Sequence, residues 1–263
     1  MKPSTIGWTD FSGGDLNFVI GCTPASEGCA NCYARSIIQE RGGRDFSQIR
    51  LYPEKLERLR KTKFPEFSPK RGAPYKPMAF VVDLGDLFHE DVPDDFIEDA
   101  LYLMKDRRDV IWQVLTKRPE RMRDVVLEWM AGDALLRVPD NIWLLATVEN
   151  RKRMQERFLP LIQIPAVVHG LSMEPMLESI EIAAYWWSAE IQWVICGAES
   201  GYKRRPFEID WAEDMYEQCQ MRGIPFFGKQ ASNLYPGSPL LIKGQPIKQW
   251  PLMSSYSSCA NLY

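Results

Sequence analysis

Three cysteines lie close together near the start of the sequence, and their spacing is the clearest chemical signal in the chain. The segment GCTPASEGCANCYARS places them at Cys22, Cys29 and Cys32. Three thiolates can ligate a [4Fe–4S] cluster and leave one iron open to a small molecule. A structural zinc site requires a fourth ligand, and a disulfide leaves one thiol over. The spacing alone therefore favours a cluster, with zinc and inert or redox-active thiols as alternatives.

The remaining cysteines and the two histidines are the candidates for a fourth metal ligand. Cys219 lies on the apolar stripe of an expected helix and Cys196 in an apolar strand, so we expect both to be core thiols. Cys259 lies in the tail of the chain. His89 and His169 are expected to be hydrogen-bonded structural residues, which is the commoner environment of a histidine in an apolar segment.

The composition is that of an ordinary globular protein, with 263 residues, 45% of them hydrophobic, and a formal charge of −3. The longest apolar runs fall short of the roughly 20 residues that cross a bilayer, and the N-terminus lacks an apolar signal core. We therefore expect a cytoplasmic protein with reduced thiols and no membrane contact. The negative net charge excludes a protein whose whole surface is basic, although the basic patches at 116–123 and 202–206 can bind phosphates.

Seven apolar runs recur along the chain, and each ends at a polar or glycine-bearing tip. The runs are LNFVIGC, MAFVVDLGD, VIWQVLTKRP, IWLLATVEN, AVVHGLSMEP, IQWVICGAESG and IPFFGKQ. Near-continuous apolarity is typical of parallel strands buried on both faces. Helical patterns lie between the runs, at 93–109, 119–133 and 210–223.

This alternation predicts an α/β fold in which a single domain forms a partial (β/α)6-type TIM-like barrel of parallel strands. A doubly wound sheet is the alternative, but no glycine-rich phosphate loop follows the first run. We expect the domain to span residues 1–263, with an insertion at about 52–77 and an irregular C-terminal extension at about 231–263.

The strand tips of such a barrel share one mouth, where the chemistry of the fold is found. Here the tips carry a polar ring: Cys22, Asp83, Asp86, Thr116, Lys117, Glu149, Asn150, Ser172, Glu174, Glu199, Ser200, Lys229 and Gln230.

Eight short segments, taken in order along the chain, form a recognisable set. They are GWTD, GCTPASEGCANCYA, DLGDLFHEDVP, LTKRPERM, TVEN, LSMEPML, GAESG and PFFGKQ. The set, from Ile6 to about Gln230, resembles a family of phage and bacterial three-cysteine proteins. That family is similar to a divergent branch of the radical S-adenosylmethionine (SAM) enzymes near spore photoproduct lyase. The chain departs from the usual radical-SAM loop because the gap between Cys22 and Cys29 is longer and Asn31 replaces an aromatic residue.

The resemblance implies that the three cysteines hold a [4Fe–4S] cluster to which SAM binds. An external one-electron reductant then allows SAM to be cleaved to a 5′-deoxyadenosyl radical. The aspartates of DLGD suit the methionine amino group, and the polar pair of TVEN suits the ribose hydroxyls. The implied cofactor-binding residues are Asp83, Asp86, Glu149, Asn150, Ser172, Glu174 and Gly197. Tyr33 is implied to contact the adenine or substrate, with Glu199 and Lys117 directed toward the substrate.

The implied substrate is a nucleotide or DNA base, in phage-type thymidine hypermodification, rearrangement or repair. Five cations can steer such an anion: Lys117, Arg118, Lys203, Arg204 and Arg205. Three aromatic residues can stack on a base: Trp143, Trp193 and Tyr202. One alternative is a zinc-stabilised β/α module that binds nucleic acid or a protein without catalysis. Another is a hydrolase that uses a divalent metal at the acidic ring, in which the cysteines are dispensable.

Overall fold

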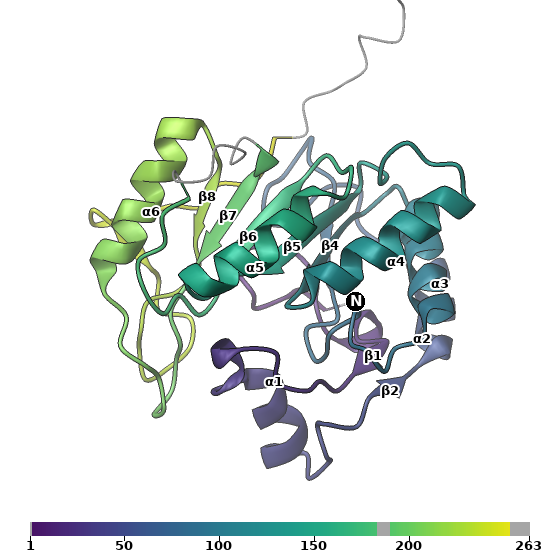
Figure 1. Ribbon diagram of the computed structural model, residues 1–263, viewed down its shortest axis with the longest axis horizontal. Coiled ribbons are helices and arrows are strands. Elements are labelled where there is room, and N and C mark those ends of the chain that lie inside the picture. Colours follow the sequence, from purple (N-terminus) through teal and green to yellow (C-terminus); the bar gives the residue numbers. More distant parts are fainter. Residues whose placement is uncertain (1, 183–189, 253–263) are drawn as a thin grey trace, which may run out of the picture.

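A curled sheet of six parallel strands forms the centre of the molecule, which a computed structural model describes for residues 2–182 and 190–252. The strands pair in the order β3-β4-β5-β6-β7-β8, which is also their order along the chain (Figure 1). Their bounds are β3 (Met78–Val81), β4 (Ile111–Thr116), β5 (Ile142–Thr147), β6 (His169–Met173), β7 (Trp193–Cys196) and β8 (Phe226–Gly228). A doubly wound sheet would reverse its strand order at a switch point. The partial barrel is therefore confirmed.

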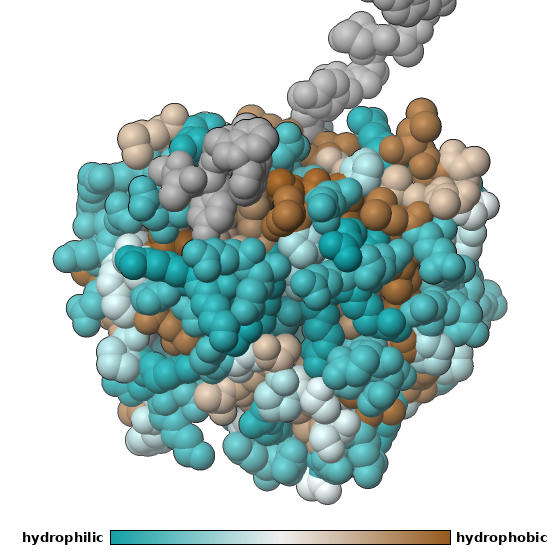
Figure 2. Space-filling model, in the orientation of Figure 1, coloured by the Kyte–Doolittle hydropathy of each residue, from teal (hydrophilic) through white to brown (hydrophobic). Residues whose placement is uncertain are grey.

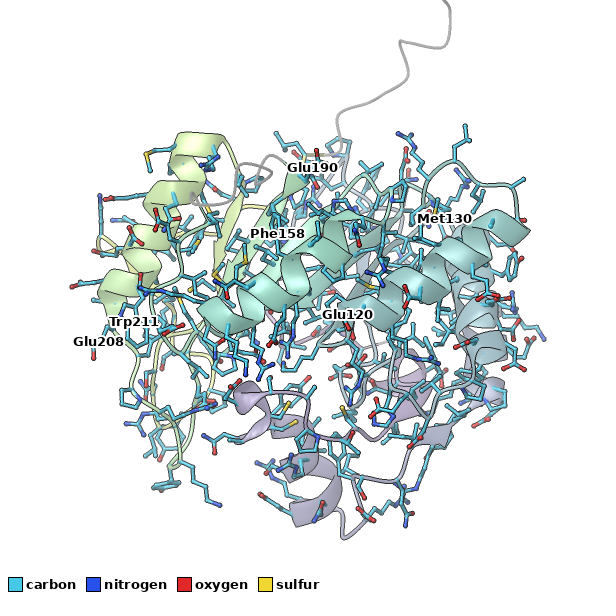
Figure 3. All side chains as sticks on the ribbon, in the orientation of Figure 1. Glu120, Met130, Phe158, Glu190, Glu208 and Trp211 are labelled. Atoms are coloured by element: carbon cyan, nitrogen blue, oxygen red, sulfur yellow. The ribbon has the colours of Figure 1, made fainter. Side chains whose placement is uncertain are left out.

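Helices connect these strands and cover the outer face of the sheet, and Figure 1 shows α4 and α5 side by side in front of it. Their bounds are α2 (Pro53–Lys61), α3 (Asp94–Asp106), α4 (Pro119–Gly132), α5 (Arg151–Ile162) and α6 (Ile209–Arg222). Glu120 and Met130 mark the two ends of α4 in Figure 3. α6 ends at Gly223, whose φ of 67° is the left-handed geometry that glycine adopts most readily.

α5 is a helix that the sequence patterns did not predict. Pro160 lies inside it, and a proline normally argues against a helix interior. The helix nevertheless forms because Asn150 caps its first turn, accepting a hydrogen bond from the Arg153 amide at 2.9 Å. Phe158 on its inner face is 1% exposed.

The two faces of the sheet carry separate hydrophobic cores. On β5, Leu144 packs in the core under the helices, whereas Trp143 faces the inside of the half-barrel. The inner core is largely aromatic: the ring centroids of Trp143 and Trp193 are 5.7 Å apart, and those of Trp8 and Trp193 are 6.0 Å apart. Trp250 closes this core by donating from its indole to the Trp8 carbonyl at 3.0 Å.

The first apolar run is not a strand of the main sheet, contrary to the prediction. β1 (Val19–Ile20) pairs instead with β2 (Arg50–Leu51) in a small antiparallel sheet. The N-terminal segment still follows the edge of β3, through single parallel bridges of Phe11 with Ala79 and Gly21 with Gly85. A 3-10 turn at Gly14–Leu16 lies between these bridges, so no continuous ladder forms.

The remaining short elements frame this arrangement. After Cys32 the chain forms α1 (Tyr33–Arg35), which continues as a π-helix at Ser36–Arg41. In the C-terminal extension, β9 (Leu241–Ile242) and β10 (Gln245–Pro246) pair in an antiparallel hairpin, so this part is more regular than predicted. Cys259 and the rest of 253–263 lie outside the described residues.

The surface agrees with a globular fold. The face seen in Figure 2, which carries α4 and α5, is mostly hydrophilic. Among the helices described, none is both long and apolar enough to span a bilayer.

Two neighbouring residues of α5 test how much the helix depends on its buried face. Replacing Phe158 with alanine should lower the free energy of unfolding by about 3–5 kcal/mol, because it leaves a cavity between the helix and the sheet. Leu159→Ala is the matched control, since this side chain is 48% exposed, and we expect its effect to stay below about 1 kcal/mol. Urea unfolding followed by circular dichroism measures both, and equal effects would contradict the packing.

Candidate functional site

The three cysteines lie on a loop that crosses the carboxyl ends of the parallel strands. We call residues 22–32 the cysteine loop. Its first anchor is Arg118, at the end of β4, which donates to the Cys22 sulfur at 3.5 Å and to the Thr23 carbonyl at 3.1 Å. Thr23 also contacts His89 Nε2 at 2.8 Å. The His89 ring accepts from the Asp91 amide through Nδ1, so Nε2 carries the proton.

Asp86 holds Arg118 in this position. Its two carboxylate oxygens accept from the Thr116 hydroxyl at 2.7 Å, the Phe88 amide at 3.0 Å and Arg118 at 3.1 Å. Burial, and next the negative charge of Asp86, raise the pKa of the Cys22 thiol to about 12. Asp86, predicted to bind a cofactor, is therefore engaged within the protein.

The second anchor is Glu149, a fully buried carboxylate at the end of β5. It accepts from the Ser26 hydroxyl at 2.5 Å and from Arg157 at 2.8 Å, while the Lys117 ammonium lies 3.5 Å away. Gly28 of the cysteine loop packs directly on this side chain, and a Cβ added there would lie 2.3 Å from the carboxylate. Glu149 and Lys117 are brought together as predicted, and Glu149 supports the loop from below.

The third anchor is Glu199, beyond the end of β7. It accepts from Asn31 of the cysteine loop at 2.9 Å and pairs with the Arg205 guanidinium. Arg205 also donates to the Glu27 carbonyl at 2.8 Å, and the Glu27 carboxylate pairs with Arg153 at 3.0 Å. Burial alone raises the pKa of Glu199, but the hydrogen bonds from Arg205 and Asn31 outweigh it, so its pKa lies below the ordinary value.

The sixth and eighth strands contribute a pair that does not touch the loop. Glu174 accepts from the Ser172 hydroxyl at 3.1 Å and the Trp8 indole at 3.3 Å, and it lies 2.8 Å from the Lys229 ammonium. A Cβ on Gly197 would lie 3.2 Å from the Glu174 carboxylate. Three of the predicted cofactor residues, Ser172, Glu174 and Gly197, are thus neighbours.

Asp83, at the end of β3, differs from the other ring carboxylates. No Lys or Arg pairs with it among the residues described, and its buried Oδ1 has no hydrogen-bond partner. Burial raises its pKa, although a hydrogen bond from Asn17 opposes this effect. Next to it, the Tyr33 hydroxyl donates to the Asp83 carbonyl at 2.5 Å, with the tyrosine side chain half exposed.

The three thiols of the loop are free. The other described cysteines and histidines are engaged elsewhere: Cys196 contacts the Met176 sulfur, Cys219 is buried in α6, and His169 bonds two backbone carbonyls. His89 lies beside the loop, but both of its ring nitrogens are occupied, by Thr23 and by the Asp91 amide. Within the described part of the chain, no three His, Cys, Asp or Glu side chains converge as a metal-binding group. Three thiols are a donor set that an iron–sulfur cluster can use, but holding one would require them to turn toward a common centre.

Other sequence expectations for the site differ from the structure. Trp143 and Trp193 are fully buried in the inner core and cannot stack on a substrate base, whereas Tyr202 is 88% exposed. Arg118 and Arg205 are used in ion pairs, which leaves Lys203 and Arg204 as exposed cations beside the loop. Sequence reasoning missed Arg157 and Gly28. Arg157 lies in α5, a helix that the sequence patterns did not predict, so the sequence carried no signal for its contact with Glu149.

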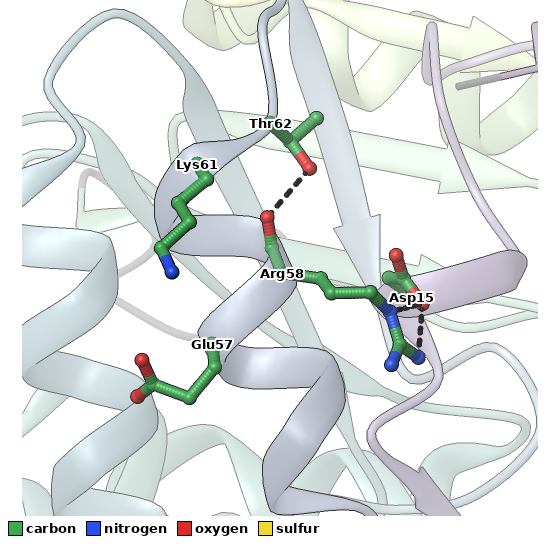
Figure 4. A pocket seen from close by; sticks show the side chains of 5 residues that line it. All are labelled: Asp15, Glu57, Arg58, Lys61 and Thr62. Atoms are coloured by element: carbon green, nitrogen blue, oxygen red, sulfur yellow. Dashed lines mark hydrogen bonds and ion pairs between the residues drawn. The ribbon is translucent and has the colours of Figure 1, made fainter.

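One surface cavity of about 360 Å³ lies at α2, lined by Asp15, Glu57, Arg58, Lys61 and Thr62 (Figure 4). Arg58 is paired there with Asp15 at 2.8 Å. None of these residues belongs to the cysteine loop or the polar ring, so this cavity is separate from the candidate site.

A protein-family model matches residues 3–243, and its description reads "Protein of unknown function (DUF5131)". The chain belongs to this family. A search of curated proteins found no match.

Solved structures of spore photoproduct lyase are similar to the chain. The complex with dinucleoside spore photoproduct has a TM-score of 0.48 at 10% identity, covering 84% of this chain and 75% of that one. A double mutant with bound AdoMet and dinucleoside spore photoproduct has a TM-score of 0.48 at 10% identity, covering 83% and 75%. Spore photoproduct lyase is also the enzyme near which the sequence motifs placed the chain. At this level of similarity the resemblance assigns no role to any residue.

Gly28 tests the contact between the cysteine loop and Glu149. Gly28→Ala should lower the free energy of unfolding by about 1–3 kcal/mol, because the new methyl group overlaps a buried, pinned carboxylate. Gly132→Ala is the control, since nothing lies within 4 Å of a Cβ there, and alanine suits the end of α4 better than glycine. Chemical denaturation distinguishes them; an unchanged stability of Gly28→Ala would show that the loop does not rest on Glu149.

Glu199 tests the third anchor through pH. Because its folded pKa is depressed, it stabilises the protein above the ordinary glutamate pKa, and this contribution is lost as the pH falls through the folded value. Glu199→Gln should therefore cost about 1–2 kcal/mol at neutral pH and progressively less in acid. Glu128→Gln on the exposed face of α4 should cost less than about 0.5 kcal/mol at neutral pH. A Glu199→Gln cost that is independent of pH would refute the ion pair.

Proposed function

We propose that this protein is a cytoplasmic radical SAM enzyme that acts on a nucleotide or DNA base. In this proposal Cys22, Cys29 and Cys32 hold a [4Fe–4S] cluster, and SAM binds at the mouth of the half-barrel. The cluster, reduced by an external one-electron donor, supplies the electron that cleaves SAM.

The observation that carries the proposal is the position of the cysteine loop. Three free thiols lie on one short loop at the carboxyl ends of a parallel half-barrel, the end at which such folds carry their chemistry. The loop is anchored to three different strand ends, through Arg118, Glu149 and Glu199. An anchored loop favours a site that must hold its ligands in a fixed orientation during turnover.

The buried Oδ1 of Asp83, which has no hydrogen-bond partner, supports SAM as the ligand. A buried carboxylate oxygen without a partner carries a desolvation cost that a cationic ligand group relieves. The ammonium of the SAM methionine moiety is such a group. In this arrangement Asp83 orients the amino group, and the half-exposed Tyr33 ring beside it packs against the adenine.

The paired carboxylates favour this chemistry over hydrolysis by a divalent metal. Each ring carboxylate other than Asp83 already has a cationic partner: Asp86 with Arg118, Glu149 with Arg157, Glu174 with Lys229 and Glu199 with Arg205. A carboxylate neutralised in this way is a poor ligand for a hard cation, which requires free anionic oxygens.

The substrate class is supported by the surface beside the loop. Lys203 and Arg204 are exposed next to Tyr202, and this combination of cations and an aromatic ring suits a phosphate and a base. In the proposal Lys117 and Glu199 face the substrate. The reaction would be hypermodification, rearrangement or repair of the base.

Anaerobic reconstitution with iron and sulfide tests the proposal. The protein should turn brown and bind about four irons and four sulfides per chain, and replacing the three cysteines with alanine should abolish this. Cys219→Ala, which removes a thiol from α6, should retain the cluster. With dithionite, SAM and candidate nucleosides, 5′-deoxyadenosine should form together with a nucleoside of altered mass. A colourless protein with one bound zinc would contradict the proposal and favour the non-catalytic binding module.

Asp83 provides a separate test of SAM binding. Asp83→Asn should weaken SAM binding at least about tenfold, because it removes a charge-assisted contact, while the iron content stays unchanged. Asp91→Asn, an exposed aspartate beyond the same strand, should leave SAM affinity unchanged. Equilibrium dialysis of the reconstituted protein measures the affinity. Equal affinities for the two variants would place the amino group elsewhere.

A further inference from the structure

A second cavity lies at the opposite end of the half-barrel from the cysteine loop. It has a volume of about 580 Å³, within the range of roughly 300–1,000 Å³ that small-molecule sites occupy. Three segments far apart in the sequence line it, at 70–75, 220–225 and 248–252. The first two segments lead into β3 and β8, the two edge strands, and the third lies against β8 through an antiparallel bridge of Lys248 with Phe227, so the cavity lies where the open sides of the half-barrel approach each other.

The residues that line the cavity include cations and no carboxylate. The cations are Lys70, Arg71 and Lys248. The Lys70 ammonium is satisfied by backbone carbonyls, including that of Ile6 at 2.6 Å. Arg71 and Lys248 form no ion pair with any residue in the described ranges. Burial lowers the pKa of Lys70, the negative charge of the buried Asp10 opposes this effect, and the positive charge of Lys248 adds to it.

The wall beside these cations is aromatic and apolar. The Arg71 guanidinium lies 3.9 Å from the Tyr75 ring centroid and 6.0 Å from that of Trp250. These contacts fix the orientation of the guanidinium, so less rotamer entropy is lost when it binds an anion. Trp250 is partly exposed, and Ile224 and Leu252 extend the apolar side of the cavity.

We propose that this cavity is a binding site for a nucleoside monophosphate or a ligand of the same chemistry, an anionic phosphate attached to a planar ring. The phosphate binds Arg71 and Lys248, which are the cations without counter-ions. The ring packs against Trp250 and its apolar neighbours. This site is distinct from the mouth of the half-barrel and does not depend on the cysteines.

Calorimetric titration of the full chain with adenosine 5′-monophosphate tests the site. The nucleotide should bind, and should bind more tightly than inorganic phosphate or adenosine, because each of these has only half of the recognised chemistry. Arg71→Gln and Lys248→Gln should each weaken nucleotide binding at least about tenfold, since each removes one charge-assisted hydrogen bond. Lys61→Gln, which removes an exposed charge on α2, should leave the affinity unchanged.

Three results would overturn the proposal. Absence of binding would reject the site, and binding unaffected by Arg71→Gln and Lys248→Gln would locate the nucleotide elsewhere, including at the mouth. Equal affinity for inorganic phosphate would reject the ring-bearing ligand. Lys248 is exposed, so its replacement keeps the test valid even if Arg71→Gln proves unstable.

Discussion

The site depends on ion pairs that tie one loop to several strand ends. Glu149 shows how this works. Its charge is buried, and the positive charges of Arg157 and Lys117 balance it. The same carboxylate accepts a hydrogen bond from the Ser26 hydroxyl of the cysteine loop. Removing one partner would leave a charge buried without compensation, which costs far more than the pair itself contributes. The cysteine loop is therefore attached to a carboxylate whose own ion pairs are costly to break.

This arrangement divides the ring residues into two groups. Three carboxylates accept hydrogen bonds from other residues of the protein and orient the cysteine loop or the arginines that contact it: Asp86, Glu149 and Glu199. Asp83 keeps a buried oxygen unpaired, and so it is the ring carboxylate with most to gain from a ligand. Of the five ring carboxylates, Asp83 alone keeps a buried oxygen that has neither a hydrogen bond nor an ion pair with any residue that the structure describes.

Much of the fold could be predicted from the sequence because apolar runs buried on both faces are distinctive. Six of the seven runs became parallel strands. The run around Val19 was wrongly predicted to be a strand of the main sheet, because apolarity indicates burial and not strand pairing. The helix α5 was missed, and Pro160 inside it is a residue that argues against a helix interior. The gathering of the polar tips was predictable from parallel topology. Their cationic partners were not, because Arg157 and Arg205 reach the ring from other elements, and sequence position does not reveal which way a long side chain turns.

The indole of Trp250 reaches the carbonyl of Trp8 across a sequence separation of 242 residues, and both rings belong to the inner core. During synthesis the first of these residues leaves the ribosome long before the second. Until then the inner face of the half-barrel lacks the packing of Trp250, and the other inner-core tryptophans are less well protected from water and from other chains. The inner core is thus complete only once segments separated by most of the described sequence have come together, and contacts of such long sequence range form slowly because their loop-closure entropy opposes them.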